Sequence, residues 1–362
     1  MTRIAVVTPS ITTGDAVSND VLGMYDVLKQ LGHETRIYAE GWSFDKPKIW
    51  PAPKIGNFLR GSSDLLIYHY SRGWDFGLEL LRELKCRKVV RYHNVTPPEF
   101  SVKFSKDYAR MCLEGRNQLP FIARSGCDLY MSDSAYNEQE LLQEGVPESK
   151  SFVIPPFQQI DRLNAIEADR EVLAGYRDGK ANILMVGRVA PNKGHPTLIE
   201  AFAAYHHDYN PKSRLLIVGK CETRLKAYNR LLFDLVRRFE LQDSVVFAGE
   251  VSDSALKAFY MAANVFMTTS EHEGFCVPLV EAMSMGVPIV AYGSSAIPGT
   301  IDKAGLIWNE RNPYLLAESV NKIVKSESIS RALGKLGLDR YQQHFTNDRI
   351  RTQFLQAAGQ FL

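Results

Sequence analysis

Two glutamates, Glu273 and Glu281, lie eight positions apart in the stretch Ser-Glu-His-Glu-Gly-Phe-Cys-Val-Pro-Leu-Val-Glu-Ala-Met. Glu273 stands beside Gly274, in a loop that follows the strand-like run 264–268. Glu281 lies in a helix that Pro278 can open, since proline is tolerated where the first helical amides are unpaired. The N-terminus of such a helix favours an anion, because free N–H groups and the helix dipole converge there. Two carboxylates beside an anion site predict a ligand with hydroxyls at both ends and charge in the middle, as in a nucleotide-sugar.

Two cations precede these glutamates. Arg188 follows the predicted strand 183–186 and Gly187, at the edge where open α/β sheets bind ligands. Lys193 lies five residues later, in a loop that ends at Gly194. A guanidinium and a mobile ammonium can together neutralise a departing diphosphate. The alternative for Arg188 and Lys193 is a pair of solvated surface cations. The chain has no D-x-D motif, which usually holds the metal ion that binds a nucleotide-sugar, so we expect no metal and no cofactor.

The first half of the chain offers further candidates at strand ends. His93 follows the predicted strand 89–92, and His69 has the same kind of position after an earlier strand. Gly14 lies in the turn between the first strand and the first helix, where glycine allows a ligand to approach the backbone. This turn is not a G-x-G-x-x-G fingerprint, which disfavours a dinucleotide. The alternative for His93 is a structural histidine, and the alternative for Gly14 is an ordinary turn.

Short apolar runs alternate with amphipathic helical segments along most of the chain. This alternation predicts parallel sheets covered on both faces. The expected strands are 4–7, 35–38, 65–68, 89–92, 129–131 and 152–154, then 183–186, 215–218, 245–247, 264–268 and 288–292. Pro155-Pro156 interrupts the pattern as a linker would. We therefore expect an α/β protein with two doubly wound, Rossmann-like domains facing a cleft, residues 1–155 and 156–347.

Bulk properties set limits on the function. The 362 residues suit two domains, and a net charge of +2 gives no reason to expect nucleic acid as a partner. Five cysteines without a C-x-x-C pair or a His/Cys cluster predict a reduced, cytoplasmic protein without structural zinc. The N-terminal apolar run is too short for a signal peptide, and no apolar run is long enough to span a membrane.

Residues 103–124 mix basic and large apolar side chains. Such a segment could rest on an anionic membrane surface, which would place the protein peripherally on the inner face of the membrane. The alternative is an amphipathic helix that packs on its own domain.

The motifs occur in an order that resembles retaining glycosyltransferases of the GT-B fold, in particular glycosyltransferase family 4. The two glutamates match the E-x7-E motif of that family, and residues 186–202 are similar to its Gly-Arg and Lys-Gly segment. Residues 216–219 and 246–252 continue the pattern. The similarity covers residues 154–345 well and the first 153 residues more loosely. Within the family, the sequence resembles bacterial mannosyltransferases of polysaccharide assembly.

The resemblance implies roles for individual residues. Glu281 would accept hydrogen bonds from the ribose hydroxyls, while Glu273 and His93 would contact the donor sugar. Gly14 would lie by the donor phosphates and the acceptor. The resemblance also implies that residues 348–362 form a helix that crosses back onto the N-terminal half.

The segment between the two glutamates completes the implied donor site. Backbone amides near Val277 and Leu279 would point at the phosphates, after Gly274 and Phe275. Cys276 stands where the family often has glycine, and Gly299 stands where it usually has a glutamate. The second difference predicts that the loop 294–300 positions its ligand in another way.

The expected function is transfer of a hexose, mannose from GDP-mannose as the first choice, with retained configuration. The acceptor would be a hydroxyl of a glycan or of a lipid-linked glycan, in polysaccharide or lipopolysaccharide assembly. The alternatives are a non-catalytic nucleotide-sugar-binding protein and another GT-B enzyme, such as an epimerase or a phosphorylase. An NAD-dependent dehydrogenase is disfavoured because the glycine fingerprint is missing.

Overall fold

The computed structural model describes residues 2–44 and 46–362, and these residues form two compact units. The first unit contains the chain up to Pro98, Ala109–Gln159 and Thr346–Leu362, and the second contains Glu99–Tyr108 and Ile160–Phe345. The division therefore falls at Gln159 rather than at 155. Residues 99–108 group with the second unit because their aromatic rings pack there: the ring of Phe104 meets that of Tyr228 edge-on at 5.0 Å.

A seven-stranded sheet with parallel pairing forms the centre of the first unit, in the order β5-β3-β1-β6-β7-β8-β9. Alternate residues of its strands belong to different cores, so that Ala5 and Val7 face one side and Ile4 and Val6 face the other. Such burial on both faces is what continuous apolar runs predict. The strands are β1 (Arg3–Val7), β3 (Glu34–Ala39), β5 (Ile49–Pro51), β6 (Leu65–Tyr70), β7 (Arg87–Tyr92), β8 (Leu129–Ser132) and β9 (Ser151–Val153).

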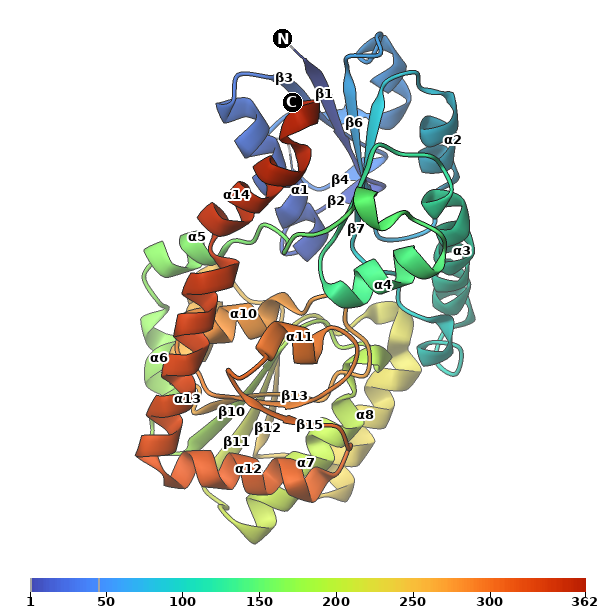
Figure 1. Ribbon diagram of the computed structural model, residues 1–362. Coiled ribbons are helices and arrows are strands. Elements are labelled where there is room, and N and C mark those ends of the chain that lie inside the picture. Colours follow the sequence, from blue (N-terminus) through green and yellow to red (C-terminus); the bar gives the residue numbers. More distant parts are fainter. Residues whose placement is uncertain (1, 45) are drawn as a thin grey trace. The chain divides into compact units, whose positions relative to one another are not determined.

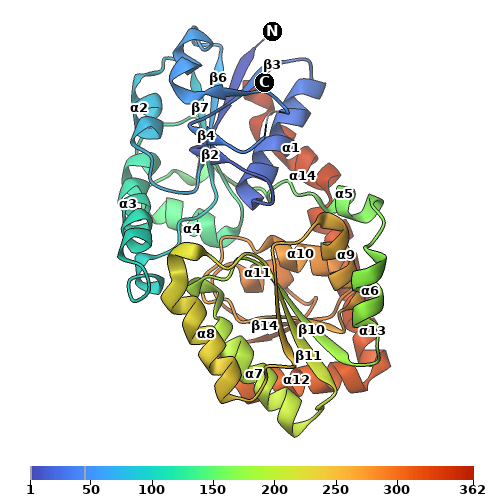
Figure 2. The same cartoon turned by 180° about the vertical axis from the view of Figure 1, so that it is seen from behind.

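Helices cover both faces of this sheet. On one side, α1 and α14 lie next to each other in both views (Figure 1, Figure 2), and Phe354 of α14 shares a core with Val21 and Met24 of α1. The sequence expectation of a C-terminal helix packed on the N-terminal half is thereby confirmed. The helices of this unit are α1 (Ala16–Gln30), α2 (Asp75–Glu83), α3 (Lys106–Ala123, which begins in the 99–108 segment), α4 (Ala135–Gln143) and α14 (Asn347–Ala358).

The second unit repeats the design with six parallel strands in the order β12-β11-β10-β13-β14-β15. Ile183 and Leu184 of the central strand face opposite cores, one beneath α7 and α12 and the other beneath α9 and α10. The strands are β10 (Ala181–Val186), β11 (Ser213–Val218), β12 (Val245–Gly249), β13 (Val265–Thr268), β14 (Ile289–Tyr292) and β15 (Leu306–Trp308). The helices are α5 (Ile160–Ala165), α6 (Arg170–Tyr176), α7 (His195–Asp208), α8 (Lys226–Arg238), α9 (Asp253–Ala262), α10 (Val277–Ser284), α11 (Ile297–Ile301), α12 (Pro313–Lys325) and α13 (Glu327–Arg340). The predicted fold, two Rossmann-like parallel sheets, is confirmed.

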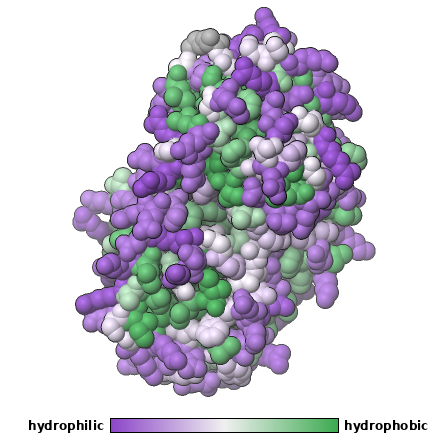
Figure 3. Space-filling model, viewed as in Figure 1, coloured by the Kyte–Doolittle hydropathy of each residue, from purple (hydrophilic) through white to green (hydrophobic). Residues whose placement is uncertain are grey.

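The surface gives no sign of a membrane-spanning segment. Within residues 2–44 and 46–362, no helix is long and apolar enough to cross a bilayer. The face in Figure 3 is largely hydrophilic, with separate hydrophobic areas. In the predicted basic segment, α3 buries Leu119 and Ile122 in its own unit while Phe121 is 67% exposed. Packing on its own domain thus accounts for the buried face of α3, and membrane contact stays a prediction.

Candidate functional site

Two glycines join the strand ends of the second unit. Gly187 (φ 146°) follows β10, Gly219 (φ 144°) follows β11, and both have backbone conformations that side chains rarely adopt. A Cβ at Gly219 would lie 2.0 Å from the carbonyl oxygen of Gly187, so the two loops can touch only without one. The contact places Arg188 at the edge of the sheet. Its side chain is 56% exposed and pairs with Glu222 at 3.6 Å.

An ion pair joins two of the predicted site residues. Lys193 Nζ lies 2.7 and 2.9 Å from the two carboxylate oxygens of Glu273, with side-chain exposures of 14% and 8%. Burial lowers the pKa of Lys193, but the Glu273 carboxylate outweighs this effect and the pKa lies above its ordinary value. The ammonium therefore stays charged. Because a Cβ at Gly187 would lie only 3.8 Å from Lys193 Nζ, this glycine belongs to the same cluster.

The loops that carry this pair are tied to each other. Gly194 has φ 65°, and a Cβ there would lie 2.0 Å from the carbonyl oxygen of Thr269. The Asn192 side chain donates to the carbonyl of His272 at 3.0 Å, and the Glu271 amide donates to the carbonyl of Asn192 at 2.8 Å. The loop after β10 is thus held against the loop after β13, which is why residues 80 positions apart can form the pair.

The segment between the two glutamates enters α10 through an unusual residue. Cys276 is the N-cap with φ 74°, a left-handed conformation that glycine adopts more easily. Burial, reinforced by Glu273, raises the pKa of its thiol well above the ordinary value, so the thiol stays protonated. The Leu279 amide already donates to the Cys276 carbonyl at 3.0 Å. Phe275 is buried in the core, and Val277 begins the helix.

Glu281 has a partner that the sequence did not reveal. Its Oε2 accepts a 2.7 Å hydrogen bond from the hydroxyl of Tyr260, a buried residue of α9. Burial raises the pKa of Glu281, and the Tyr260 hydrogen bond partly opposes this effect. Tyr260 and Glu281 are 21 positions apart on different helices, so spacing carries no signal of the contact.

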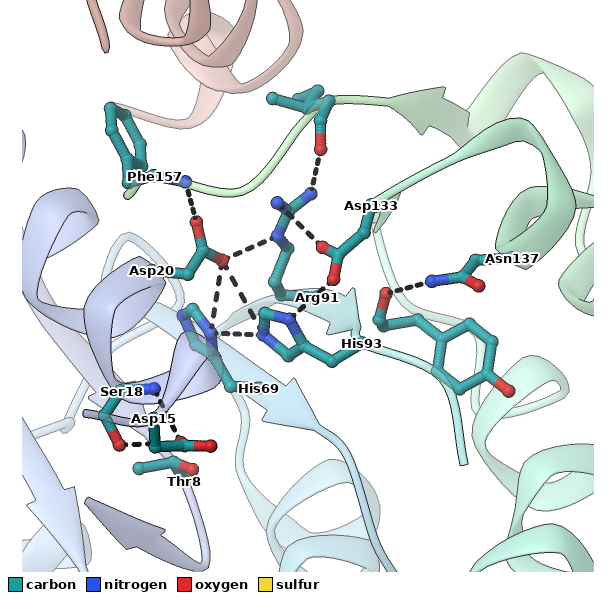
Figure 4. A network of polar contacts seen from close by, with 12 residues as sticks. Thr8, Asp15, Ser18, Asp20, His69, Arg91, His93, Asp133, Asn137 and Phe157 are labelled. Atoms are coloured by element: carbon teal, nitrogen blue, oxygen red, sulfur yellow. Dashed lines mark hydrogen bonds and ion pairs between the residues drawn. The ribbon is translucent and has the colours of Figure 1, made fainter. Parts of the chain in front are cut away.

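The other two predicted residues belong to the first unit. Gly14 is exposed, with φ 73°, in the turn before α1. His93 follows β7 directly with its side chain 3% exposed, and both of its ring nitrogens have partners in its own unit (Figure 4). Its Nδ1 lies 2.9 Å from Asp133 Oδ2, and its Nε2 lies 2.9 Å from Nδ1 of His69.

Arg91 holds the histidine pair in a wider network. Its Nε donates to Asp20 Oδ2 at 2.8 Å, and its Nη2 lies 2.9 Å from Asp133 Oδ1. Burial lowers the pKa of Arg91, but the carboxylates of Asp20 and Asp133 raise it by more than burial lowers it. The guanidinium therefore stays charged. Burial, His93 and Arg91 hold the pKa of His69 well below its ordinary value despite Asp20, so this imidazole is neutral.

Sequence reasoning did not single out Asp20, Arg91 or Asp133. A signal was available for two of them. Asp20 lies on the apolar face of α1, next to Val21, and Arg91 interrupts the apolar strand β7. A charged residue at a core position is almost never unpaired, so each predicts a buried partner.

The two Rossmann-like parallel sheets, each covered by helices on both faces, define the fold as the GT-B type. Residues 168–339, within the second unit, match the family described as Glycosyl transferases group 1. The structure of Alr3699/HepE of Anabaena in complex with UDP-glucose has a TM-score of 0.78 at 18% identity, covering 99% of this chain and all of the other. A sucrose-phosphate synthase from Thermosynechococcus elongatus has a TM-score of 0.76 at 20% identity, covering 99% of both chains.

The matches to curated relatives cover a smaller part of both chains than the matches to these structures. Mannosylfructose-phosphate synthase of Agrobacterium fabrum is 26% identical over 309 residues, which cover 79% of this chain. A GDP-mannose-dependent α-(1-6)-phosphatidylinositol monomannoside mannosyltransferase of Mycobacterium tuberculosis is 26% identical over 241 residues, or 62% of this chain. The chain spans 66% and 61% of the lengths of these two relatives.

Proposed function

We propose that the protein is a retaining glycosyltransferase that moves a hexose from a nucleoside diphosphate sugar to a hydroxyl of a glycan or lipid-linked acceptor. The observation that carries this proposal is the Lys193–Glu273 pair, held between two strand-end loops of the segment that matches the family. A charged ammonium at the carboxyl edge of a Rossmann-like sheet is suited to a diphosphate. No metal or cofactor is required for that contact.

Each cation has a distinct task in this proposal. Lys193 Nζ, already oriented by Glu273, would contact a phosphate oxygen on its free side. Arg188, whose side chain is 56% exposed and pairs with Glu222 at 3.6 Å, would turn toward the diphosphate. Negative charge grows on the diphosphate as the glycosidic bond breaks, so both cations stabilise the transition state more than the bound donor.

The carboxylates would hold the two ends of the donor. Glu273 would contact the sugar while keeping Lys193 charged, and Glu281 would accept hydrogen bonds from the ribose hydroxyls while its Oε2 accepts one from Tyr260. At the start of α10 the Val277 amide would face the phosphates, since Pro278 has no N–H. The Leu279 amide is left out of this role because it donates to Cys276.

His93 bears on the stereochemistry. An inverting enzyme needs a base in line behind the anomeric carbon, and a histidine hydrogen-bonded to a carboxylate, as His93 is to Asp133, is a typical base. Its Nε2, however, lies against His69, and its side chain is 3% exposed. Either a base role or a hydrogen bond to the sugar would require one partner to leave. This favours front-face transfer, in which the departing diphosphate takes the acceptor proton.

Mannose is the first choice of sugar, with GDP-mannose as donor. The names of the two curated relatives support this choice, whereas the UDP-glucose complex of the Anabaena protein makes UDP-glucose the second donor to examine. The acceptor class rests on the resemblance to polysaccharide mannosyltransferases, and peripheral membrane contact rests on residues 103–124.

A panel of nucleotide-sugars tests the proposal. A ligand that binds only the folded protein raises the melting temperature, so GDP-mannose should give the largest rise, and Glu281→Ala should reduce it. The same donors are then incubated with acceptor glycans, and release of nucleoside diphosphate and transfer to the acceptor are measured. Binding without release or transfer would favour a non-catalytic binding protein, and a changed sugar on the nucleotide would favour an epimerase. No shift with any donor would refute the proposal.

A further inference from the structure

Three potential ligand atoms converge inside the first unit. Asp20 Oδ2 comes from α1, His69 Nδ1 from β6, and His93 Nε2 from the residue after β7 (Figure 4). The two ring nitrogens are 2.9 Å apart, and each lies 3.6 Å from the carboxylate oxygen. These residues are far apart in the sequence, so no sequence motif predicts the cluster.

The triangle of donor atoms has the size of a metal site. With sides of 2.9, 3.6 and 3.6 Å, the point equidistant from the three atoms lies about 2.0 Å from each, which is the zinc–nitrogen and zinc–oxygen bond length. A cation near this point would lie within bonding distance of all three donor atoms. From this geometry we propose that Asp20, His69 and His93 bind one divalent first-row transition-metal ion, with zinc as the type and a fourth position left for water.

Surrounding groups support two of the three proposed ligands, His93 and Asp20, whereas Nε2 of His69 is buried without a hydrogen-bond partner among the described residues. His93 presents its other ring nitrogen to Asp133 at 2.9 Å, the carboxylate–histidine arrangement that orients a ligand and raises its basicity. Asp20 Oδ1, the carboxylate oxygen that is not a proposed ligand, accepts a hydrogen bond from the Phe157 amide at 2.7 Å. Arg91 donates to Asp20 and pairs with Asp133, so the carboxylates have fixed positions before any ion enters.

Charge favours a cation at this place. Two carboxylates face one guanidinium, and the exposed fractions of these three side chains are between 0% and 6%. The network therefore has an excess negative charge in a buried position when both imidazoles are neutral, which is costly. With a divalent ion bound, the charges of Arg91 and Asp133 cancel each other. The ion and its three ligands, two neutral histidines and one carboxylate, then have the same net charge as the His₂Glu zinc sites.

The rival occupant is a proton. Asp133 fixes the Nδ1–H of His93, so in the absence of metal His69 donates its Nδ1–H to His93 Nε2, or an added proton is shared between the rings. The ligands of the proposed ion all belong to the first unit, whereas Lys193, Glu273 and Glu281 belong to the second. The proposal thus leaves the metal-free contact with the donor diphosphate unchanged.

The test is metal analysis of the full-length protein, made in zinc-supplemented and in cobalt-supplemented medium and dialysed without chelator. We expect one equivalent of metal per chain and, in the cobalt protein, visible d–d absorption. His69→Gln, which keeps a hydrogen-bonding side chain, should lose both signals, and Asp133→Asn should weaken binding by about 10–100-fold. His33→Ala, a histidine of the same unit outside the network, should keep both.

Circular dichroism and melting curves of each variant separate loss of metal from loss of fold. A folded wild-type chain with no more metal than His69→Gln would overturn the proposal and leave the shared proton as the occupant. Equal metal in His69→Gln and wild type would overturn it as well, since the metal would then be bound elsewhere.

Discussion

Both units have charged side chains near the carboxyl ends of parallel strands, Arg91 within the end of β7 and Lys193 in the loop after β10, yet the two clusters differ in how the charges are paired. In the first unit, Arg91 has two carboxylate partners and is 1% exposed. In the second, Lys193 has one partner and Arg188 is 56% exposed. A cation enclosed by carboxylates contributes to the fold, whereas a cation with an accessible side can still bind an anion. The difference teaches that a strand-end charge is a candidate for donor binding only when its partners leave part of it accessible.

The largest effect should come from breaking the enclosed cluster. Arg91→Met removes the only cation between Asp20 and Asp133 in that network and leaves two buried carboxylates, so unfolding should become easier by about 3–5 kcal/mol. Urea denaturation measures the loss. Arg82→Met, at an exposed ion pair with Glu83 in the same unit, is the matched control and should change stability by less than about 1 kcal/mol. An Arg91 variant as stable as the control would show that the network does not stabilise the unit.

Lys193→Ala should have the next largest effect, on turnover. Removing one preorganised charge from a transition state commonly lowers kcat by about 10²–10³-fold. Arg188→Ala should lower kcat less, because its side chain is more exposed. Steady-state kinetics with varied donor separates the two parameters: if only KM rises, the cations bind the donor without stabilising the leaving group.

Glu281→Ala should weaken donor binding by about 1–3 kcal/mol, the range for hydrogen bonds to a charged acceptor. Isothermal titration with the donor found by the panel gives the affinity. Glu318→Ala, an exposed helical glutamate paired with Lys322, is the control and should bind donor normally. Unchanged affinity in the Glu281 variant would remove this residue from the ribose site.

The smallest change should come from Tyr260→Phe, which deletes one hydrogen bond to Glu281 and keeps the ring. Donor affinity should fall by about 1 kcal/mol because the carboxylate loses its fixed orientation. A fall as large as that of Glu281→Ala would mean that the whole orientation of Glu281 depends on Tyr260. No fall would mean that α10 alone positions the carboxylate.

Much of the fold could be predicted because the spacing of apolar residues along the sequence indicates which residues are buried. The predicted strands 4–7 and 65–68 lie within β1 and β6, and the expected last helix corresponds to α14. Four short strands were missed: β2 (Ser10–Ile11) and β4 (Gly41–Trp42) have two residues each and pair with each other, β5 ends in Pro51, and β15 has three residues, too few for a visible pattern.

The contacts within the site were less accessible to prediction. The types and positions of Lys193 and Glu273 indicated chemistry, but their pairing depends on Gly194 lying against Thr269, which is a property of the packed loops. The partners of His93 come from other strands and from α1. Side chains on separate elements leave no local spacing in the sequence, so only the fold could bring them together.

The central claim is front-face transfer, supported by the partners that both ring nitrogens of His93, the candidate base, have within its own unit. The most direct measurement is the anomeric configuration of the product made from an α-linked donor. For mannose, the one-bond carbon–proton coupling at the anomeric centre distinguishes the two forms by NMR. We predict an α-linked product. A β-linked product would contradict the claim and would require His93 to separate from His69 and act as the base.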